Sequence, residues 1–321
     1  MNSKDIEFDL DARGKRIELG RGVFKAVYRG KYFGTPVAVR CCCGACLLAQ
    51  CMSHPPQINM LLEESASEND KQEFLRECNV LSNLRHGNII GLLGACTDTK
   101  QYFLLTELMD NGTLYGVLHE RHVALTPKQR QDIVLGMLMG MNNMHMRRIY
   151  HRDLKSANIL LDAHFTPKIA DFGFAKQKSA AKQKELFMSK VLPRHPCHAS
   201  TFLPPLHLNL THCPLQVGTP LWMAPEVLLA QQYDPEKADV WSVGMLVFEV
   251  LVSKVPYSTP GLQATTEAQL SQMIQQGRRP PTDGIHPQVV ALLHRCWDID
   301  PSRRPSVGEM LKEYQRIIRG N

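Results

Sequence analysis

The residues best suited to chemistry lie in an octapeptide, HRDLKSAN at residues 151–158, and a tripeptide, DFG at residues 171–173. Asp153, Asn158 and Asp171 carry carboxylate and amide oxygens, which are hard donors. The same residue types in loops are ordinarily turn formers. The interpretation of these three side chains therefore depends on the sequence around them.

A second candidate lies near the N-terminus, where GRGVF at residues 20–24 separates two strand-like segments. Glycine lacks a Cβ, so backbone amides in such a turn can approach a phosphate closely. A single glycine-rich turn is weak evidence for nucleotide binding.

The segments that must position these residues differ between the two halves of the chain. Residues 15–38 read as two strands and a third, and 89–95 and 101–108 read as two more. Between them, residues 67–84 predict a helix with an apolar stripe at Phe74, Cys78, Leu81 and Leu84, and Ser67 and Asp70 resemble a capping box. The turn signal at residues 110–112 predicts a boundary between two lobes.

The second half is predicted to be helical, with helices at residues 126–146, 237–252, 267–275, 287–297 and 307–318. Thr126 and Pro127 form a helix-start signal, and the methionines of the first helix are interpreted as core filling. A small β-rich part followed by a larger helical part predicts an α+β fold of two lobes with a cleft.

Two stretches, about residues 41–66 and 178–216, have no apolar period, although patterned sequence resumes after each. Long structureless loops are uncommon inside compact domains. Both are either surface insertions or non-coding sequence retained in a faulty gene model, and we favour the second interpretation.

Composition excludes several classes of protein. Apolar residues make up 44% and charged residues 21% of the 321 residues, which excludes a mainly disordered or fibrous chain. We expect no membrane span, because no apolar run approaches 18 residues, and no signal peptide, because residues 1–10 are charged. The net charge of +6 is spread without a basic block, so we expect no nucleic-acid partner.

Ten cysteines are present, five of them between Cys41 and Cys51. In the expected cytoplasmic location they would be thiols. Cys43 and Cys46 have the spacing of half a zinc site, but no second pair follows at zinc-ribbon spacing, so metal binding there is disfavoured.

Five ordered motifs together resemble a eukaryotic protein kinase: the glycine-rich turn, HRDLKSAN, DFG, GTP at residues 218–220 and APE at residues 224–226. The resemblance covers about residues 15–317 and implies the two-lobed kinase fold. The implied N-lobe is 15–109, with an insertion at about 41–66. The implied C-lobe is 110–317, with an activation-segment insertion at about 178–216.

The resemblance implies roles for the motif residues. Asp153 would accept the proton of a substrate hydroxyl, Lys155 would neutralise the γ-phosphate of ATP, and Thr219 would bond to both. Asn158 and Asp171 would ligate Mg²⁺. The implied nucleotide-binding residues are Leu19, Gly20, Gly22, Lys25, Val27, Ala38, Arg40, Glu77, Thr106, Glu107, Met109 and Leu160, with Thr106 as gatekeeper in a hinge at 106–109.

The chain departs from the family pattern at strand three, where Arg40 ends Val37-Ala38-Val39-Arg40 in place of the usual lysine. Arginine keeps the charge but presents a bulkier planar fork. Lys25 replaces the third glycine of the turn, as in the with-no-lysine kinases, and alternation places it on the face of Val27. It is therefore predicted to be the main phosphate ligand and the favoured partner of Glu77 over Arg40, or else it is a solvated turn residue.

Other matches imply structural roles. Glu77 shares the inward face of its predicted helix and would pair with Lys25 or Arg40. His151, Leu81 and Phe172 would pack in an internal spine. Glu226 and Arg304 would form a buried ion pair, and Asp239 would cap the catalytic loop.

Substrate class follows from the same resemblance. Lys155 and Thr219 match Ser/Thr kinases, whereas LLGAC at 92–96 and WMAPE at 222–226 look like the tyrosine-kinase-like group, whose members mostly phosphorylate Ser or Thr. The expected partner is a protein substrate with Ser or Thr, and the oligomeric state is open. The rival hypothesis is a pseudokinase that acts as a scaffold or allosteric module, favoured by Arg40 and both insertions.

Overall fold

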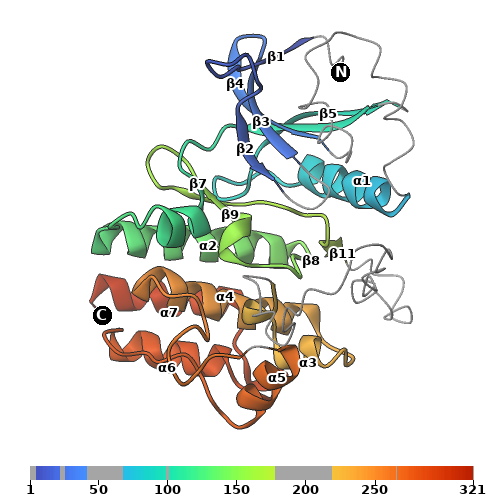
Figure 1. The fold of residues 1–321 in the computed structure, drawn as a ribbon. Helices are drawn as coiled ribbons and strands as arrows, with labels where there is room; N and C mark the ends of the chain where they lie inside the picture. The colour runs from blue at the N-terminus through green and yellow to red at the C-terminus, as the bar shows by residue number, and fades with distance from the viewer. Residues whose placement is uncertain are drawn as a thin grey trace, which may run out of the picture. The chain divides into compact units, whose positions relative to one another are not determined.

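The computed structural model describes residues 5–21, 26–41, 68–98, 101–177, 219–264 and 266–320. The chain forms two compact units. The first comprises Met1–His151 and Ser156–Lys176, and the second comprises Arg152–Lys155 and Gln177–Asn321. Within each unit, helices and strands follow the order seen along the colour ramp of Figure 1.

The first unit contains a six-stranded antiparallel sheet (Figure 1). Its order is β1-β3-β4-β6-β5, with β2 paired to β3. The strands are β1 Ile6–Phe8, β2 Glu18–Arg21, β3 Ala26–Tyr32, β4 Thr35–Cys41, β5 Leu92–Asp98 and β6 Gln101–Glu107. The alternation of apolar residues had predicted five of these strands; β1 is too short to give such a signal.

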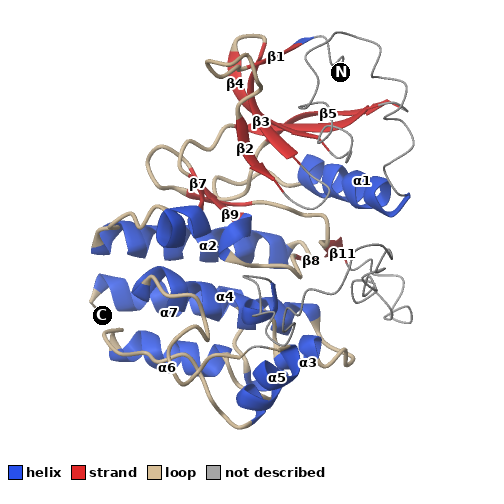
Figure 2. Cartoon of the chain, viewed as in Figure 1, coloured by secondary structure: helices blue, strands red, loops and turns tan. Residues whose placement is uncertain are grey.

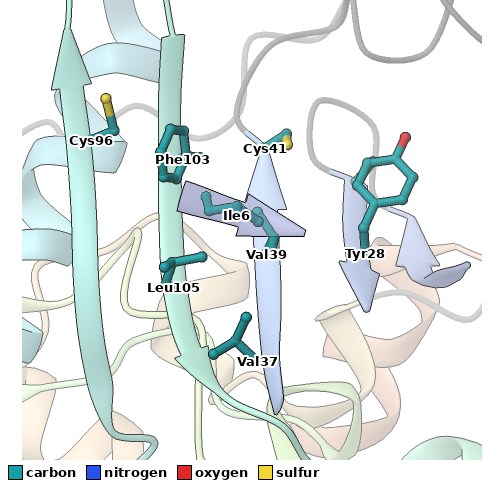
Figure 3. Packing of buried hydrophobic residues seen from close by; sticks show 9 residues of the cluster. Ile6, Tyr28, Val37, Val39, Cys41, Cys96, Phe103 and Leu105 are labelled. Carbon is teal, nitrogen blue, oxygen red and sulfur yellow. The ribbon is translucent and has the colours of Figure 1, made fainter. Parts of the chain in front are cut away.

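Alternation divides the sheet into two faces. On β4, Val37, Val39 and Cys41 are buried, while Ala38 and Arg40 are partly exposed on the other face. The buried side chains meet in one cluster, which Figure 3 shows with Ile6, Tyr28, Cys96, Phe103 and Leu105 around β4. This apolar face fixes the register, because a slip of one residue would move Arg40 into the core.

Helix α1 (Glu68–Asn83) packs along β5 and β6 (Figure 1). Its inward side chains include Phe74 and Leu81, each 2% exposed, and Leu84, directly after the helix, is 3% exposed. Of the predicted apolar stripe, Cys78 is only partly buried. Glu77 is 1% exposed on the same stripe. The capping residue proposed for this helix, Ser67, lies outside the described residues.

The remainder of the first unit is built on α2 (Pro127–Met146) and short strands. Thr126 and Gln129 form a capping box at the start of α2, which confirms the helix-start signal. Strands β7 Gly112–Thr113, β9 Ile159–Leu161 and β10 Pro167–Ile169 form a small sheet, and β8 covers Ile149–Tyr150.

Helix α2 packs closely against β10, and this contact explains where the units divide. A Cβ added at Gly136 would lie 2.5 Å from Pro167 Cγ, so only glycine fits there. Helix α2 groups with β9 and β10 in the first compact unit, whereas the lobe boundary predicted at residues 110–112 stays a prediction.

The second unit is helical (Figure 2). Its helices are α3 Pro225–Leu228, α4 Pro235–Val252, α5 Glu267–Gln275, α6 Pro287–Cys296 and α7 Val307–Arg319, and β11 (Lys176–Gln177) lies where the two units meet in sequence. Helix α4 is buried without interruption from Ala238 to Val250. A helix that is buried all round lies at the centre of its unit, although this one also buries the carboxylates of Asp239 and Glu249.

Two guanidinium groups flank Trp241 on this central helix. Arg279 Cζ and Arg304 Cζ lie 5.0 and 5.1 Å from the ring centroid. Cation–π contacts of this kind are favourable when the cation has lost its water. They attach the segments before α6 and α7 to the core of the second unit.

Arg304 is a large charged residue of the second unit, and its side chain is fully buried. Its two terminal nitrogens donate to Glu226 at 2.6 and 2.9 Å, and its Nε donates to the carbonyl of Asp298 at 2.9 Å. The ion pair expected from the sequence is confirmed. It connects α3 to the turn that precedes α7.

The helices and cysteines of the described part of the chain bear on the expected absence of a membrane span and of disulfides. None of its helices has the length and hydropathy needed to cross a bilayer. Its cysteines Cys41, Cys78, Cys96 and Cys296 are free thiols. Burial, first of all, raises the pKa of Cys296 to about 12, so that thiol stays protonated and unreactive. Cys43 and Cys46 lie outside the described residues.

The adjacent arginines 303 and 304 allow a matched test of burial. Arg304→Ala leaves the buried Glu226 carboxylate without its partner and is expected to lower the free energy of unfolding by about 3–5 kcal/mol. Arg303 is exposed and makes only a 3.8 Å contact to Asp300, so Arg303→Ala should change it by less than about 1 kcal/mol. Urea denaturation of the two variants measures both. An equal loss of unfolding free energy in the two variants would show that the buried ion pair stabilises the fold no more than the exposed contact.

Candidate functional site

The cation that ends β4 makes the central contact of the first unit. A terminal nitrogen of Arg40 forms an ion pair with Glu77 Oε1, and the two side chains are 14% and 2% exposed. The sequence favoured Lys25 as the partner of Glu77 over Arg40. In the part of the chain that the structure describes, the partner is Arg40, because the fork of arginine reaches from β4 to the inward face of α1.

Arg40 also faces the DFG tripeptide. Its other terminal nitrogen lies 3.6 Å from Asp171 Oδ1, and the Asp171 side chain is 31% exposed. Glu77 Oε1 additionally accepts a hydrogen bond from the backbone N–H of Phe172 at 3.3 Å. One guanidinium thus joins the carboxylates of α1 and of DFG, which are far apart in sequence.

The fit around Arg40 is incomplete. Among the described residues, neither Arg40 Nε nor Glu77 Oε2 has a hydrogen-bond partner, although both atoms are buried. An arginine and a carboxylate can form two parallel bonds, and here the second is replaced by the contact to Asp171. The side chain therefore divides its charge between two acceptors.

Asp171 has an unusual backbone, with φ at +63°. A non-glycine residue in this region is strained, and such strain often occurs at functional positions. The segment is fixed on both sides. Ala170 N donates to Asn158 O at 2.9 Å, which places Asn158 beside the residue before Asp171, and Arg76 donates to Gly173 O at 3.1 Å.

The predicted spine is present in the first unit. The rings of His151 and Phe172 are 5.4 Å apart, and both residues are fully buried together with Leu81 at 2%. His151 Nε2 lies 3.0 Å from the carbonyl oxygen of Ala170. The imidazole therefore supports the DFG backbone, and Phe172 is held inside the core.

The residues implied for adenine binding lie on the sheet face opposite the apolar cluster. In the ladders, Val27 is opposite Arg40 and Ala38 is opposite Thr106, so these four share one face. Met109 follows β6 and is 7% exposed. Leu160 is partly buried on β9, and Leu19 on β2 is 46% exposed.

Glu107 has a structural role at the end of β6. Its Oε1 accepts from the N–H of Gly91 at 2.7 Å and forms an ion pair with Lys168 at 3.0 Å. The side chain holds the hinge to β10. The backbone of Glu107, which the resemblance assigned to adenine, also donates from its N–H to Gly91 O at 3.2 Å.

The second unit contains Asp153 and Lys155. Lys155 Nζ lies 3.0 Å from Asp153 Oδ2, and both side chains are largely buried. The backbone N–H of Arg152 donates to the buried Asp239 carboxylate at 2.8 Å, which confirms that Asp239 caps this loop. Arg152 has φ at +70°, a second strained residue beside a candidate catalytic group.

Several predicted residues cannot be placed. Gly22 and Lys25 lie outside the described residues, and Gly20 and Thr219 are described by backbone only. Sequence reasoning also missed three positioning contacts: Arg76 to Gly173, Lys168 to Glu107, and Arg152 Nε to the Tyr233 hydroxyl at 3.3 Å. Each joins segments distant in sequence, and neither spacing nor periodicity signals such contacts.

Comparison with known proteins agrees with this geometry. The family model for the protein kinase domain matches residues 57–314. A probable serine/threonine-protein kinase of Dictyostelium discoideum is 31% identical over 314 residues, which are 98% of this chain and 29% of that protein. Serine/threonine-protein kinase STY17 of Arabidopsis thaliana is 30% identical over 319 residues, 98% of this chain and 46% of that protein.

A further relative has a different specificity in its name. The dual specificity protein kinase shkB of Dictyostelium discoideum is 31% identical over 323 residues, 99% of this chain and 41% of that protein. The chain thus spans less than half the length of each of these three relatives. The family match begins at residue 57, after β1 to β4, so the predicted domain limits 15–317 stay a prediction.

The buried pair predicts an asymmetric double-mutant cycle. Arg40→Met strands a carboxylate that is 1% exposed, and the expected loss of unfolding free energy is about 3 kcal/mol. Adding Glu77→Met removes the stranded charge and should recover at least about 1 kcal/mol of that loss. Urea denaturation of the parent, both single variants and the double variant measures the coupling. A double variant as unstable as the sum of the single variants would contradict the pairing.

Proposed function

Because the chain belongs to the protein kinase family, we propose that it transfers the γ-phosphate of ATP to serine or threonine hydroxyls of proteins. The supporting observation is the contact of Arg40 with both Glu77 and Asp171. It brings a strand cation, a helix carboxylate and the DFG carboxylate together, and phosphoryl transfer depends on such positioning more than on covalent chemistry.

Asn158 and Asp171 would hold Mg²⁺. Their oxygen donors suit this ion, the Asp171 carboxylate is 31% exposed, and Asn158 O accepts a hydrogen bond from the N–H of Ala170, the residue before Asp171. When bound, the ion supplies neutralisation of phosphate charge. Asn158 and Asp171 would keep their positions through the backbone bond from Ala170 to Asn158.

Asp153 would accept the proton of the substrate hydroxyl, and Lys155 would donate to the transferred phosphate. In the free chain the Lys155 ammonium lies 3.0 Å from Asp153 Oδ2, so the proposed base and the proposed phosphate donor are already neighbours. Thr219 would hydrogen-bond to both. The Asp239 carboxylate fixes the backbone of this loop from Arg152, so Asp153 need not reorganise.

The nucleotide would lie on the sheet face that carries Val27, Ala38 and Thr106. Backbone groups of Glu107 and Met109 would bind adenine, and Leu19 and Leu160 would cover it. The turn at Gly20 and Gly22 would approach the phosphates.

We assign the principal phosphate contact to Lys25 and not to Arg40. Arg40 is already shared between two carboxylates, so little of its charge is left for a phosphate. If the alternation of β3 (Ala26–Tyr32) is extended by one residue along the sequence, Lys25 would share the face of Val27. A compact ammonium on a flexible stem reaches a phosphate as a point charge.

Specificity for serine and threonine rests on Lys155 and Thr219 and on two relatives that are named serine/threonine-protein kinases. Membership of the tyrosine-kinase-like group rests on LLGAC and WMAPE. We propose a cytoplasmic location, with substrate proteins as partners.

A pseudokinase is the second candidate, and Arg40 is the specific observation that favours it. In that case the Arg40 contacts would be purely structural and the chain would act as a scaffold. Transfer of phosphate distinguishes the two candidates.

The proposed base predicts a loss of transfer without a loss of binding. Asp153→Asn is expected to lower phosphate transfer by about 10²–10⁴-fold, because the substrate hydroxyl keeps its proton. Binding of a fluorescent ATP analogue should stay within about twofold, whereas Asp171→Ala should abolish the Mg²⁺-dependent part of that binding. Transfer of radiolabelled phosphate measures the activity, and fluorescence titration measures the binding of the ATP analogue. Asp132→Asn, on the exposed face of α2, is the control. Equal residual transfer in the parent and Asp153→Asn leaves only the scaffold.

The assignment of Lys25 predicts that removing this lysine lowers phosphate transfer, whereas removing another lysine of the same segment does not. Lys25→Met is expected to lower transfer by at least about 10²-fold through loss of a phosphate contact. Lys31→Met, at an exposed position on the same face of β3, should leave transfer within about twofold. Lys25→Gly combined with Arg40→Lys should restore part of the activity. Full activity of Lys25→Met would show that this lysine is a solvated turn residue.

A further inference from the structure

A charged cavity lies wholly within the second unit. None of the residues that line it is among those proposed above to bind the nucleotide or the substrate hydroxyl. Its volume is about 600 Å³. It is bounded by the start of α4, the end of α6, the turn at Pro301–Arg303 and one face of α7. The lining side chains are Lys237, Arg295, Ser302, Arg303, Arg304, Pro305, Glu309, Lys312, Glu313 and Arg316.

The lining is strongly basic. It contains six cations and two carboxylates, a formal excess of +4. The Glu226 partner of Arg304 reduces this to +3, and Asp300, 3.8 Å from Arg303, reduces it to +2. The whole chain has a net charge of +6, so a large part of its excess is concentrated here.

The carboxylates of the cavity are already used by the protein. Glu313 pairs with Arg295, and Glu309 accepts from the backbone N–H and the hydroxyl of Ser306 in the capping box of α7. These Ser306 bonds, followed by the nearby charges of Lys237 and Arg295, lower the pKa of Glu309. Both carboxylates therefore have partners other than Lys312 and Arg316.

Lys312 and Arg316 are the cations left over. They are one helical turn apart on α7 and both are exposed. Within the described ranges, no carboxylate lies within ion-pair distance of either. Buried Arg304 and the Lys237 amine, which donates to Arg304 O at 2.6 Å, form the floor beneath them.

We propose that this cavity binds a phosphorylated serine or threonine on a protein segment. Arginine forks and lysine ammonium groups converging on one hollow match the geometry and charge of a phosphate dianion. The volume allows the phosphorylated side chain and its neighbours to enter. The positive net charge of the lining favours an anionic ligand over a cationic one. The site rests on the proposed function, because a protein kinase produces this group.

The test uses the full chain and a fluorescein-labelled pool of degenerate nonapeptides with a central phosphoserine. Fluorescence anisotropy is expected to show at least about tenfold tighter binding of this pool than of the same pool with serine. Lys312→Gln combined with Arg316→Gln should weaken binding of the phosphorylated pool at least about tenfold, because the two unpaired cations are lost. Equal binding of both pools, or unchanged binding by this double variant, overturns the proposal.

The matched control is Lys254→Gln combined with Arg319→Gln. It removes one exposed lysine and one exposed arginine of the same unit, outside the cavity, and should keep the parent affinity. Thermal unfolding of both double variants verifies that each is folded. Loss of binding in the control would reveal a non-specific charge effect. Binding of phosphatidylcholine vesicles with phosphatidylserine, without binding of the peptide pool, would replace the proposal with a membrane surface.

The assay contains no nucleotide, so its result is independent of catalysis. A chain that binds the phosphorylated pool but transfers no phosphate contradicts only the proposed function. A chain that transfers phosphate without binding the pool contradicts only this site.

Discussion

The Glu77 carboxylate is the constraint on which the first unit depends. It is 1% exposed on the inward stripe of a helix, where an unpaired charge would be strongly unfavourable. Arg40 compensates it from β4, and the Phe172 backbone adds a hydrogen bond. One buried charge therefore sets the position of α1 against the sheet and of the DFG segment against both. The apolar face of the sheet supplies the stability, and this charge supplies the specificity of the arrangement.

The choice of arginine at this position changes what the site can do. A lysine ammonium could exchange between a carboxylate and a phosphate, whereas the fork of Arg40 contacts Glu77 and Asp171 at the same time. Its Nε and Glu77 Oε2 lack partners among the residues described, so the fit is not that of an optimised bidentate pair. The strand cation consequently serves the internal structure, which is why the proposed function assigns the phosphate contact to another residue.

The sequence predicted elements better than contacts. Period-two alternation identified β4 and β6, and the Thr126–Gln129 capping box identified the start of α2, since these signals are local. It also predicted Glu226 with Arg304, because that pair followed from a family resemblance. It could not favour Arg40 as the partner of Glu77, since that choice depends on side-chain reach between a strand and a helix. The positive φ of Asp171 and Arg152 has no sequence signal either, because neither residue is a glycine.

The proposed catalytic residues of the second unit match the kinase sequence pattern, whereas the strand cation of the first unit departs from it. In the second unit, Asp239 holds the Arg152 backbone and Lys155 lies against Asp153, so each buried charge has a partner of opposite charge or a backbone donor. In the first unit, the strand cation is replaced and its charge divided. The second unit therefore keeps the charged groups on which the proposed function depends in satisfied positions, and the departure at Arg40 lies in the first unit.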